Sequence, residues 1–72
     1  MIIYNPFWKT LEKQNISTYT LIHKYKVSGS TITRLKHNLP LSTTTLNHLC
    51  RILNCRLDEI AVYIPEVTEN KD

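Results

Sequence analysis

Glycine is nearly absent from this chain of 72 residues, which contains only Gly29. A loop that cradles nucleotide phosphates needs several glycines, so the neighbouring Ser30 and Thr31 do not form one. Long apolar runs are also missing, and no stretch approaches the roughly 20 residues that cross a bilayer. The segment 1–6 lacks the basic start of a secretory signal. We therefore expect a cytoplasmic protein without a nucleotide loop and without a membrane partner.

Cysteine is scarce, with only Cys50 and Cys55. Two cysteines are too few for a disulfide scaffold. We expect both in one helix, where residues five apart point about 140° away from each other and form no bridge. No Cys-x-x-Cys or paired-histidine spacing suggests zinc. Because nothing pairs a nucleophile with a base, we expect no enzyme, no metal and no cofactor; a small hydrolase would need a histidine beside Cys50 or a serine.

Acidic residues are rare in most of the chain. Residues 1–56 carry eight lysines and arginines against one acidic residue, Glu12. Residues 57–72 carry five acidic residues and one lysine. A basic body fits the binding of a polyanion such as nucleic acid, although an ordinary solvated surface is the alternative.

Capping residues and three prolines divide the chain into helices. Asn5-Pro6 predicts the first start, and serines predict three more at Ser17, Ser28 and Ser42. We expect an all-α domain, 1–65, followed by an acidic, frayed tail, 66–72. Its five short helices are expected at about 5–15, 17–25, 28–37, 42–54 and 57–63.

Apolar residues gather at both ends of this domain. Ile2, Ile3 and Tyr4 suggest a short extended arm, and the segment 62–64 has more apolar residues than one face of a short helix can bury. The two groups either cover each other within one chain or form a subunit interface. We expect a homodimer.

The second and third expected helices are joined by a tight connection at Lys26-Val27. The third helix buries Ile32 and Leu35 and presents a polar stripe on its opposite side. Two short helices joined by a tight turn, with a polar outer side on the second, are typical of a helix-turn-helix. In this motif the second helix enters the major groove of DNA and its side chains reach the base edges.

Two motifs occur in order along the chain, Val27-Ser28-x-x-Thr31-Ile32-x-Arg34-Leu35 and Leu53-Asn54-Cys55-x-Leu57-Asp58-Glu59-Ile60. With them the sequence resembles the Cro/repressor-type helix-turn-helix family. This resemblance implies a lambda-repressor-like fold of five short helices and binding of double-stranded DNA.

The resemblance also implies roles for individual residues. The positions that contact bases fall on Gly29, Ser30, Thr33 and Arg34. The positions that hold phosphates fall on Thr18, Lys36, His37, Asn38, Ser42, Thr43 and Thr44. Arg34 is the strongest candidate for base recognition, because a guanidinium can bridge O6 and N7 of guanine.

Three positions depart from the family pattern. Ile22 stands where alanine is usual, Lys26 where glycine is usual, and Arg56 where a small cap is usual. A positive φ at Lys26 would cost about 1 kcal/mol.

We therefore expect a sequence-specific, repressor-like transcriptional regulator of bacterial or phage type, with residues 28–37 in the major groove. The alternative is a helical protein-interaction module that has kept the fold and lost DNA binding.

Overall fold

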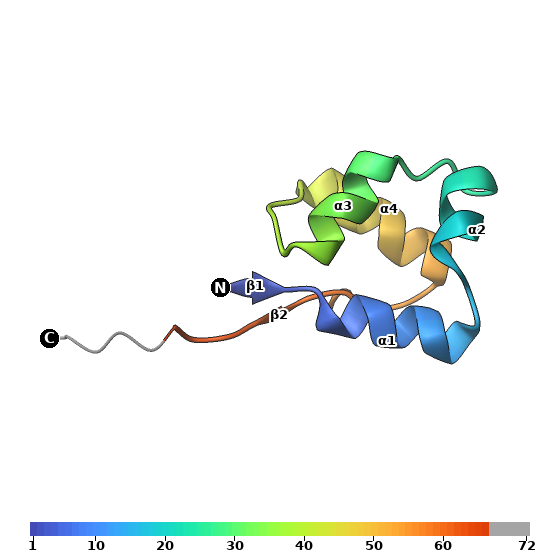
Figure 1. Cartoon of the computed structure of the whole chain (residues 1–72). Helices are drawn as coiled ribbons and strands as arrows, with labels where there is room; N and C mark the ends of the chain where they lie inside the picture. Colours follow the sequence, from blue (N-terminus) through green and yellow to red (C-terminus); the bar gives the residue numbers. More distant parts are fainter. Residues whose placement is uncertain (67–72) are drawn as a thin grey trace, which may run out of the picture.

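A computed structural model describes residues 1–66 of the chain, which form four α-helices and a small two-stranded sheet (Figure 1). The elements follow in the order β1 (Ile2–Ile3), α1 (Asn5–Gln14), α2 (Thr18–His23), α3 (Gly29–Lys36), α4 (Thr43–Leu53), the single 3-10 turn η1 (Leu57–Glu59) and β2 (Val62–Tyr63). The expected frayed tail lies almost wholly outside the described residues; its first residue, Glu66, forms an ion pair of 3.5 Å with the amino group of Met1.

The helices α2, α3 and α4 begin with the same local pattern, a serine followed three residues later by a threonine. The Oγ of each serine accepts the backbone N–H of its threonine at 3.1 Å, as the sequence predicted for the caps Ser17, Ser28 and Ser42. Each cap satisfies one of the amide groups that a helix start leaves without an internal partner.

Three helices end at an asparagine in the left-handed conformation. Asn15, Asn38 and Asn54 have φ values of 58°, 55° and 49°. The N–H of the following residue donates to a carbonyl five positions back, for example from Cys55 to Cys50 at 3.0 Å. This is the Schellman arrangement, which satisfies carbonyls at a helix end. It confirms the predicted ends at Asn15 and Asn54. Asn38, which lies between the expected helices 28–37 and 42–54, takes the same left-handed conformation, which those ranges did not predict.

The core draws on every helix. Its most completely buried large side chains are Phe7, Leu21, Leu35, Leu49, Leu53 and Ile60. Burial of these side chains holds α3 against the rest of the domain, and this positions its outer face.

The expected fifth helix, 57–63, is wrong. Only Leu57–Glu59 form one 3-10 turn, and the chain then becomes extended. Strand β2 pairs antiparallel with β1, with Ile2 opposite Tyr63 and Ile3 opposite Val62. β-branched and aromatic residues favour strands when a partner is present. The all-α class is therefore corrected to a mostly helical domain with a small sheet. The two apolar ends pair with each other within one chain, but Ile2, Val62 and Tyr63 stay exposed.

The expected end of the second helix and the expected cap of the first helix are also corrected. Helix α2 ends at His23 rather than near Tyr25. Helix α1 is capped by Tyr4 without a side-chain hydrogen bond, so Asn5 is its first helical residue and not its cap.

The two cysteines do not share a helix, because Asn54 ends α4 before Cys55. Both thiols are free. Burial, with the neighbouring Cys50 next in importance, raises the pKa of Cys55 from 9.0 to about 11. The expected 140° separation is therefore wrong, since it assumed one continuous helix.

Candidate nucleic-acid interface

The connection between α2 and α3 is held by one buried side chain and one hydrogen bond. Val27 is buried, and its N–H donates to the carbonyl of Leu21 at 2.9 Å. Lys26 immediately before it has a φ of 61°, the left-handed conformation for which the family usually has glycine at this position. A lysine can occupy it at a cost of about 1 kcal/mol, which the burial of Val27 offsets.

The four expected base-contacting residues lie together on the outer side of α3. Gly29, Ser30, Thr33 and Arg34 are all exposed, whereas Ile32 and Leu35 of the same helix are buried. This arrangement follows from the spacing of the apolar residues, which turns the remaining positions outward.

Gly29 has no structural requirement to be glycine. Its φ is not positive, and a Cβ built on it would meet no heavy atom within 4 Å. Glycine nevertheless weakens a helix relative to alanine. The bare backbone at the start of α3 is therefore an open surface that a ligand can approach closely.

The side chain of Arg34 lies toward the segment that follows α3. Its Nη1 donates to the carbonyl of Pro40 at 3.4 Å, which is long for a hydrogen bond and correspondingly weak. The guanidinium can therefore leave this contact for a stronger acceptor at low cost.

Asn38 has a structural role that the sequence analysis missed. Its Oδ1 accepts the backbone N–H of Tyr4 at 2.9 Å, and the Tyr4 hydroxyl donates to the carbonyl of Leu39 at 2.8 Å. These bonds fix the end of α3 to the start of α1. Burial also raises the pKa of Tyr4, so its hydroxyl stays protonated and able to donate. The only local signal was an asparagine after a helix, which is typical of a left-handed cap.

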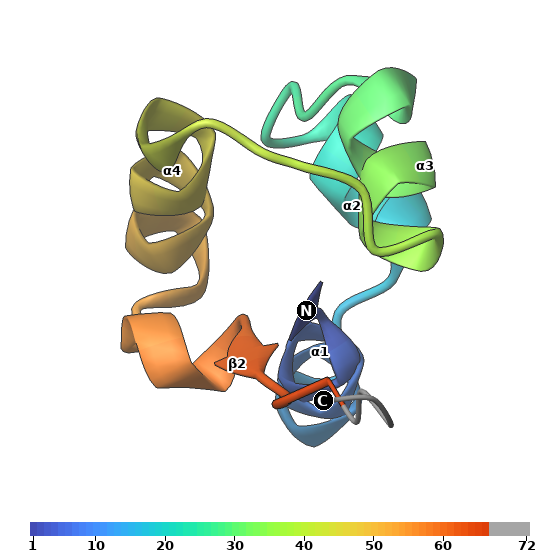
Figure 2. The ribbon, with the colours of Figure 1, turned by 90° about the vertical axis from the view of Figure 1, so that its left-hand side faces the viewer.

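The expected phosphate-holding residues lie near both ends of α3. Lys36 and His37 are exposed at its end, and Ser42, Thr43 and Thr44 are exposed at the start of α4. Figure 2 shows the connecting segment running from the end of α3 to the start of α4. Thr18 is half-buried at the start of α2.

A hollow of mixed polar and apolar lining joins the turn to the start of α4. This space of 280 Å³ is lined by Lys26, Val27, Ser28 and Thr31 from the turn and α3, and by Thr44, Thr45, His48 and Leu49 from α4. Lys26 and His48 were not predicted to meet here, because no local pattern shows which residues far apart in the chain come together.

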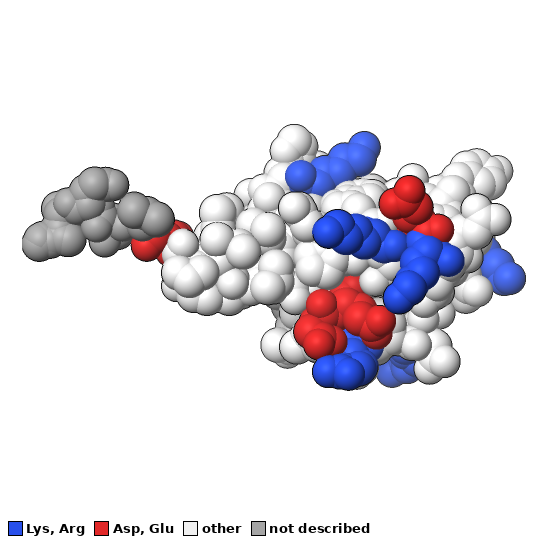
Figure 3. All heavy atoms as spheres, turned by 90° about the horizontal axis from the view of Figure 1, so that it is seen from below, with Lys and Arg blue, Asp and Glu red and all other residues white. Residues whose placement is uncertain are grey.

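Charge is distributed unevenly over the domain. No aspartate or glutamate occurs between Glu12 and Asp58, so α2, α3 and α4 carry none. The face seen from below, on the side of α1, carries acidic as well as basic groups (Figure 3). Positive potential therefore dominates the helices that include the candidate interface.

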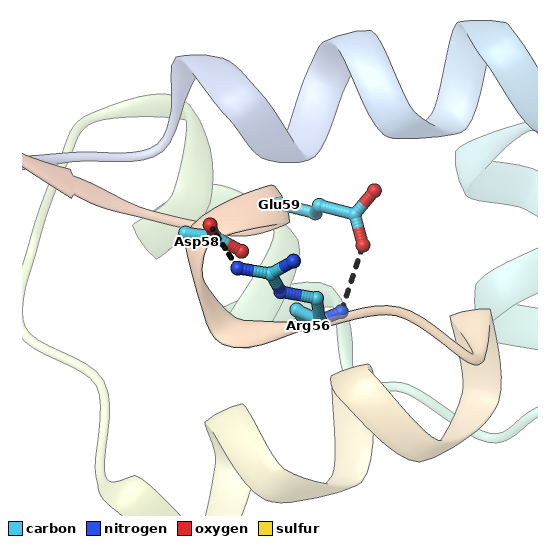
Figure 4. A network of polar contacts seen from close by, with 3 residues as sticks. All are labelled: Arg56, Asp58 and Glu59. Carbon is cyan, nitrogen blue, oxygen red and sulfur yellow. Dashed lines mark hydrogen bonds and ion pairs between the residues drawn. The ribbon is translucent and has the colours of Figure 1, made fainter.

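The acidic residues of η1 are engaged with Arg56. Its Nη2 forms an ion pair of 3.1 Å with Asp58 Oδ2, and its backbone N–H donates to Glu59 Oε1 at 2.8 Å (Figure 4). This explains how Arg56 is accommodated where the family has a small cap. Glu59 supplies one half of a capping box, because its carboxylate accepts the N–H of the cap residue. The other half is missing, because the arginine side chain has no acceptor for an N–H of the turn.

Within residues 1–66, no helix is long and apolar enough to cross a membrane. The same residues contain no group of three or more histidines, cysteines, aspartates and glutamates placed to hold a metal ion.

Comparisons with known proteins agree with this geometry. Residues 7–66 match the Cro/C1-type HTH DNA-binding domain. A solved structure of the transcriptional regulator VanUg is 34% identical, with a TM-score of 0.81 over 90% of this chain and 87% of that one. The search of curated proteins found no match. Because the family match spans most of the sequence, the chain belongs to the family of Cro/C1-type helix-turn-helix DNA-binding domains.

Proposed function

We propose that this protein is a sequence-specific transcriptional regulator that inserts α3 into the major groove of double-stranded DNA. The observation that carries the proposal is the exposed stripe of Gly29, Ser30, Thr33 and Arg34 on helices that lack acidic residues. An α-helix fits the major groove, and the surrounding positive charge favours the phosphate backbone.

The residues take different parts in this proposal. Arg34 donates two hydrogen bonds to a guanine, and Gly29 lets the backbone approach the DNA closely. Thr18, Lys36, His37, Asn38, Ser42, Thr43 and Thr44 hold phosphates on either side, which fixes the orientation of α3 without selecting a sequence. Asn38 would donate through its Nδ2 amide, while its Oδ1 accepts the N–H of Tyr4.

The proposed function also implies a cellular location and an oligomeric state. The protein works in the cytoplasm, without a catalytic site, and binds DNA as a homodimer whose two copies of α3 reach successive turns of the groove. The similarity to VanUg, a transcriptional regulator, supports this proposal.

Selection of bound sequences from a random duplex pool is the first test, and the selected site is then used to compare Arg34→Ala with Arg51→Ala. Both variants lose one exposed positive charge, but Arg51 belongs to α4 and is outside the stripe. We expect Arg34→Ala to lose about 1–3 kcal/mol of discrimination at one base pair. Arg51→Ala should keep the parent's preference. Equal sequence preferences in parent and Arg34→Ala would remove Arg34 from this role.

The alternative is a helical protein-interaction module that has lost DNA binding. Absence of duplex affinity even at low salt, where phosphate contacts are strongest, would favour that alternative. The lack of acidic residues on α2, α3 and α4 argues against it.

A further inference from the structure

The two cysteines of the chain meet where α4 ends. Cys50 lies in the last turn of α4, and Asn54 ends the helix in the left-handed conformation, with a φ of 49°. The N–H of Cys55 donates to the carbonyl of Cys50 at 3.0 Å. A Schellman end of this kind brings the side chains at these two positions into contact. Both thiols are free, and each residue leaves part of its surface exposed to solvent.

The separation of the two cysteines is short enough for a disulfide. With standard bond lengths, a backbone hydrogen bond of 3.0 Å keeps their Cα atoms within about 7 Å of each other. Cysteines farther apart than about 7 Å cannot be bridged without movement of the backbone, and this pair is inside that limit. The thiols also affect each other: burial contributes most to raising the pKa of Cys55, and the next contribution comes from Cys50.

The end of α1 has the same backbone arrangement with a different pair of side chains. Asn15 is left-handed there, and the N–H of Ile16 donates to the carbonyl of Leu11 at 2.9 Å. Leu11 is buried, and Ile16 packs against the core. An apolar contact is the usual one at these two positions. Packing at such an end therefore needs only two apolar side chains, whereas the end of α4 takes both cysteines of the chain.

We propose that Cys50 and Cys55 form a reversible dithiol–disulfide site, which small-molecule disulfides of the glutathione type oxidise to an intramolecular bridge. Disulfides in the cytoplasm are usually transient and redox-sensing, and a pair that closes under oxidation and reopens under reduction fits this use. The proposal does not depend on DNA binding. Cys50 lies at the opposite end of α4 from Ser42, roughly 12 Å along the helix axis.

The oxidation proceeds by two exchange steps. The Cys50 thiolate attacks one sulfur of the small disulfide, whose S–S bond breaks and releases one small thiolate. Cys55 then gives its proton to solvent, and its sulfur attacks Cys50 Sγ and expels the second small thiolate. The protein loses two protons and two electrons, and the small disulfide takes them up to become two thiols.

The order of the two steps follows from the weak acidity of Cys55. Its pKa of about 11, raised by burial first and by Cys50 next, leaves little thiolate near neutral pH. Only a thiolate attacks a disulfide, so Cys50 reacts first. Cys55 reacts second, because it is held against the mixed disulfide at Cys50 and this proximity compensates for its weak acidity.

Incubation of the reduced full chain with oxidised glutathione, followed by acid quenching and mass spectrometry, tests the proposal. We expect the parent to lose the mass of two hydrogen atoms, to retain no glutathione and to form no disulfide-linked dimer. Excess reduced glutathione should reverse the change. Cys50→Ser and Cys55→Ser should each stop as a mixed disulfide, and Cys55→Ser should form it faster because it keeps the attacking thiol.

Thermal melting gives a second measurement. The bridge closes a short ring and restricts the unfolded chain, so oxidation should raise the Tm of the parent by about 5 °C or more. Oxidised glutathione should produce no such rise in Cys50→Ser or Cys55→Ser, which cannot bridge. Both cysteines are only partly buried, so these variants should fold, and circular dichroism checks it.

The matched control uses the two left-handed helix ends. Asn54→Val and Asn15→Val each place a β-branched residue, for which a positive φ is unfavourable, at an exposed position. Both should lower the Tm of the reduced chain. Only Asn54→Val should disturb the thiol pair, and we expect it to lower the equilibrium constant for bridging at least about threefold. Asn15→Val should bridge like the parent.

Several results would overturn the proposal. A parent that does not react, that keeps glutathione on a thiol, or that forms disulfide-linked dimers in place of the internal bridge would show that the two thiols do not act as a pair. Equal bridging by Asn54→Val and Asn15→Val would show that the left-handed end of α4 does not place them. Faster reaction of Cys50→Ser than of Cys55→Ser would overturn the assignment of Cys50 as the attacking thiol.

Discussion

Gly29 offers a change that should move stability and DNA affinity in opposite directions. It is the first residue of α3 and is exposed. An added methyl meets nothing within 4 Å, and the backbone φ is not positive. Alanine therefore fits the folded chain. It also restricts the unfolded chain, which is the reason that glycine costs about 0.5–1 kcal/mol in a helix.

We expect Gly29→Ala to raise the free energy of unfolding by about 0.5 kcal/mol, the lower end of that range, because the site is at the edge of the helix. For a domain of this size the gain corresponds to a rise in Tm of roughly 2–4 °C. If α3 enters the major groove, the same methyl meets the DNA at the N-terminal end of the recognition helix. We expect a loss of about tenfold in affinity, or 1.4 kcal/mol, for the selected duplex.

Thermal melting followed by circular dichroism and fluorescence anisotropy with labelled duplexes measure the two effects. Asn47→Ala is the matched control, because Asn47 is exposed on α4 and alanine there improves helix propensity by a comparable amount. It should gain stability and keep its DNA affinity. Parent-like affinity of Gly29→Ala would refute the argument that this position needs a bare backbone, and a lower Tm would refute the argument that a methyl fits.

Two further predictions concern the stability of the fold, one at Lys26 in the turn and one at Cys55 after the end of α4. Lys26→Gly should raise the free energy of unfolding by up to about 1 kcal/mol, since φ is 61° there; urea unfolding that shows no gain would mean that the lysine is unstrained. For Cys55, whose pKa rises from 9.0 to about 11, the unfolded chain loses the thiol proton first, so stability should fall as pH rises between these values. The same fall in Cys55→Ala would assign it to other groups.

The sequence predicted the features that depend on a few neighbouring residues. A serine cap contacts an amide three positions away, and a left-handed asparagine closes bonds over five positions. These contacts depend on residue type and spacing alone. The outward stripe of α3 was predictable for the same reason, because Ile32 and Leu35 fix which side is buried.

Contacts between distant segments were not predictable in this way. The bond from Tyr4 to Asn38 joins residues 34 positions apart. The hollow between Lys26 and Thr44 likewise requires α4 to lie beside the turn. No local pattern identifies either pair, although each residue type was compatible with its role.

The error over residues 57–63 has the greatest structural consequence. Asp58 and Glu59 at a helix start are genuine helical signals, and they do produce one 3-10 turn. The next residues become a strand only because β1, at the opposite end of the chain, supplies the partner. A helix would have distributed its side chains around an axis with period 3.6, whereas the strand places Ala61 and Tyr63 on one face. The hollow of 510 Å³ that Ile2, Ala61 and Tyr63 help to line therefore depends on this long-range pairing. Separation of β1 from β2 should remove it while leaving the stripe on α3 in place.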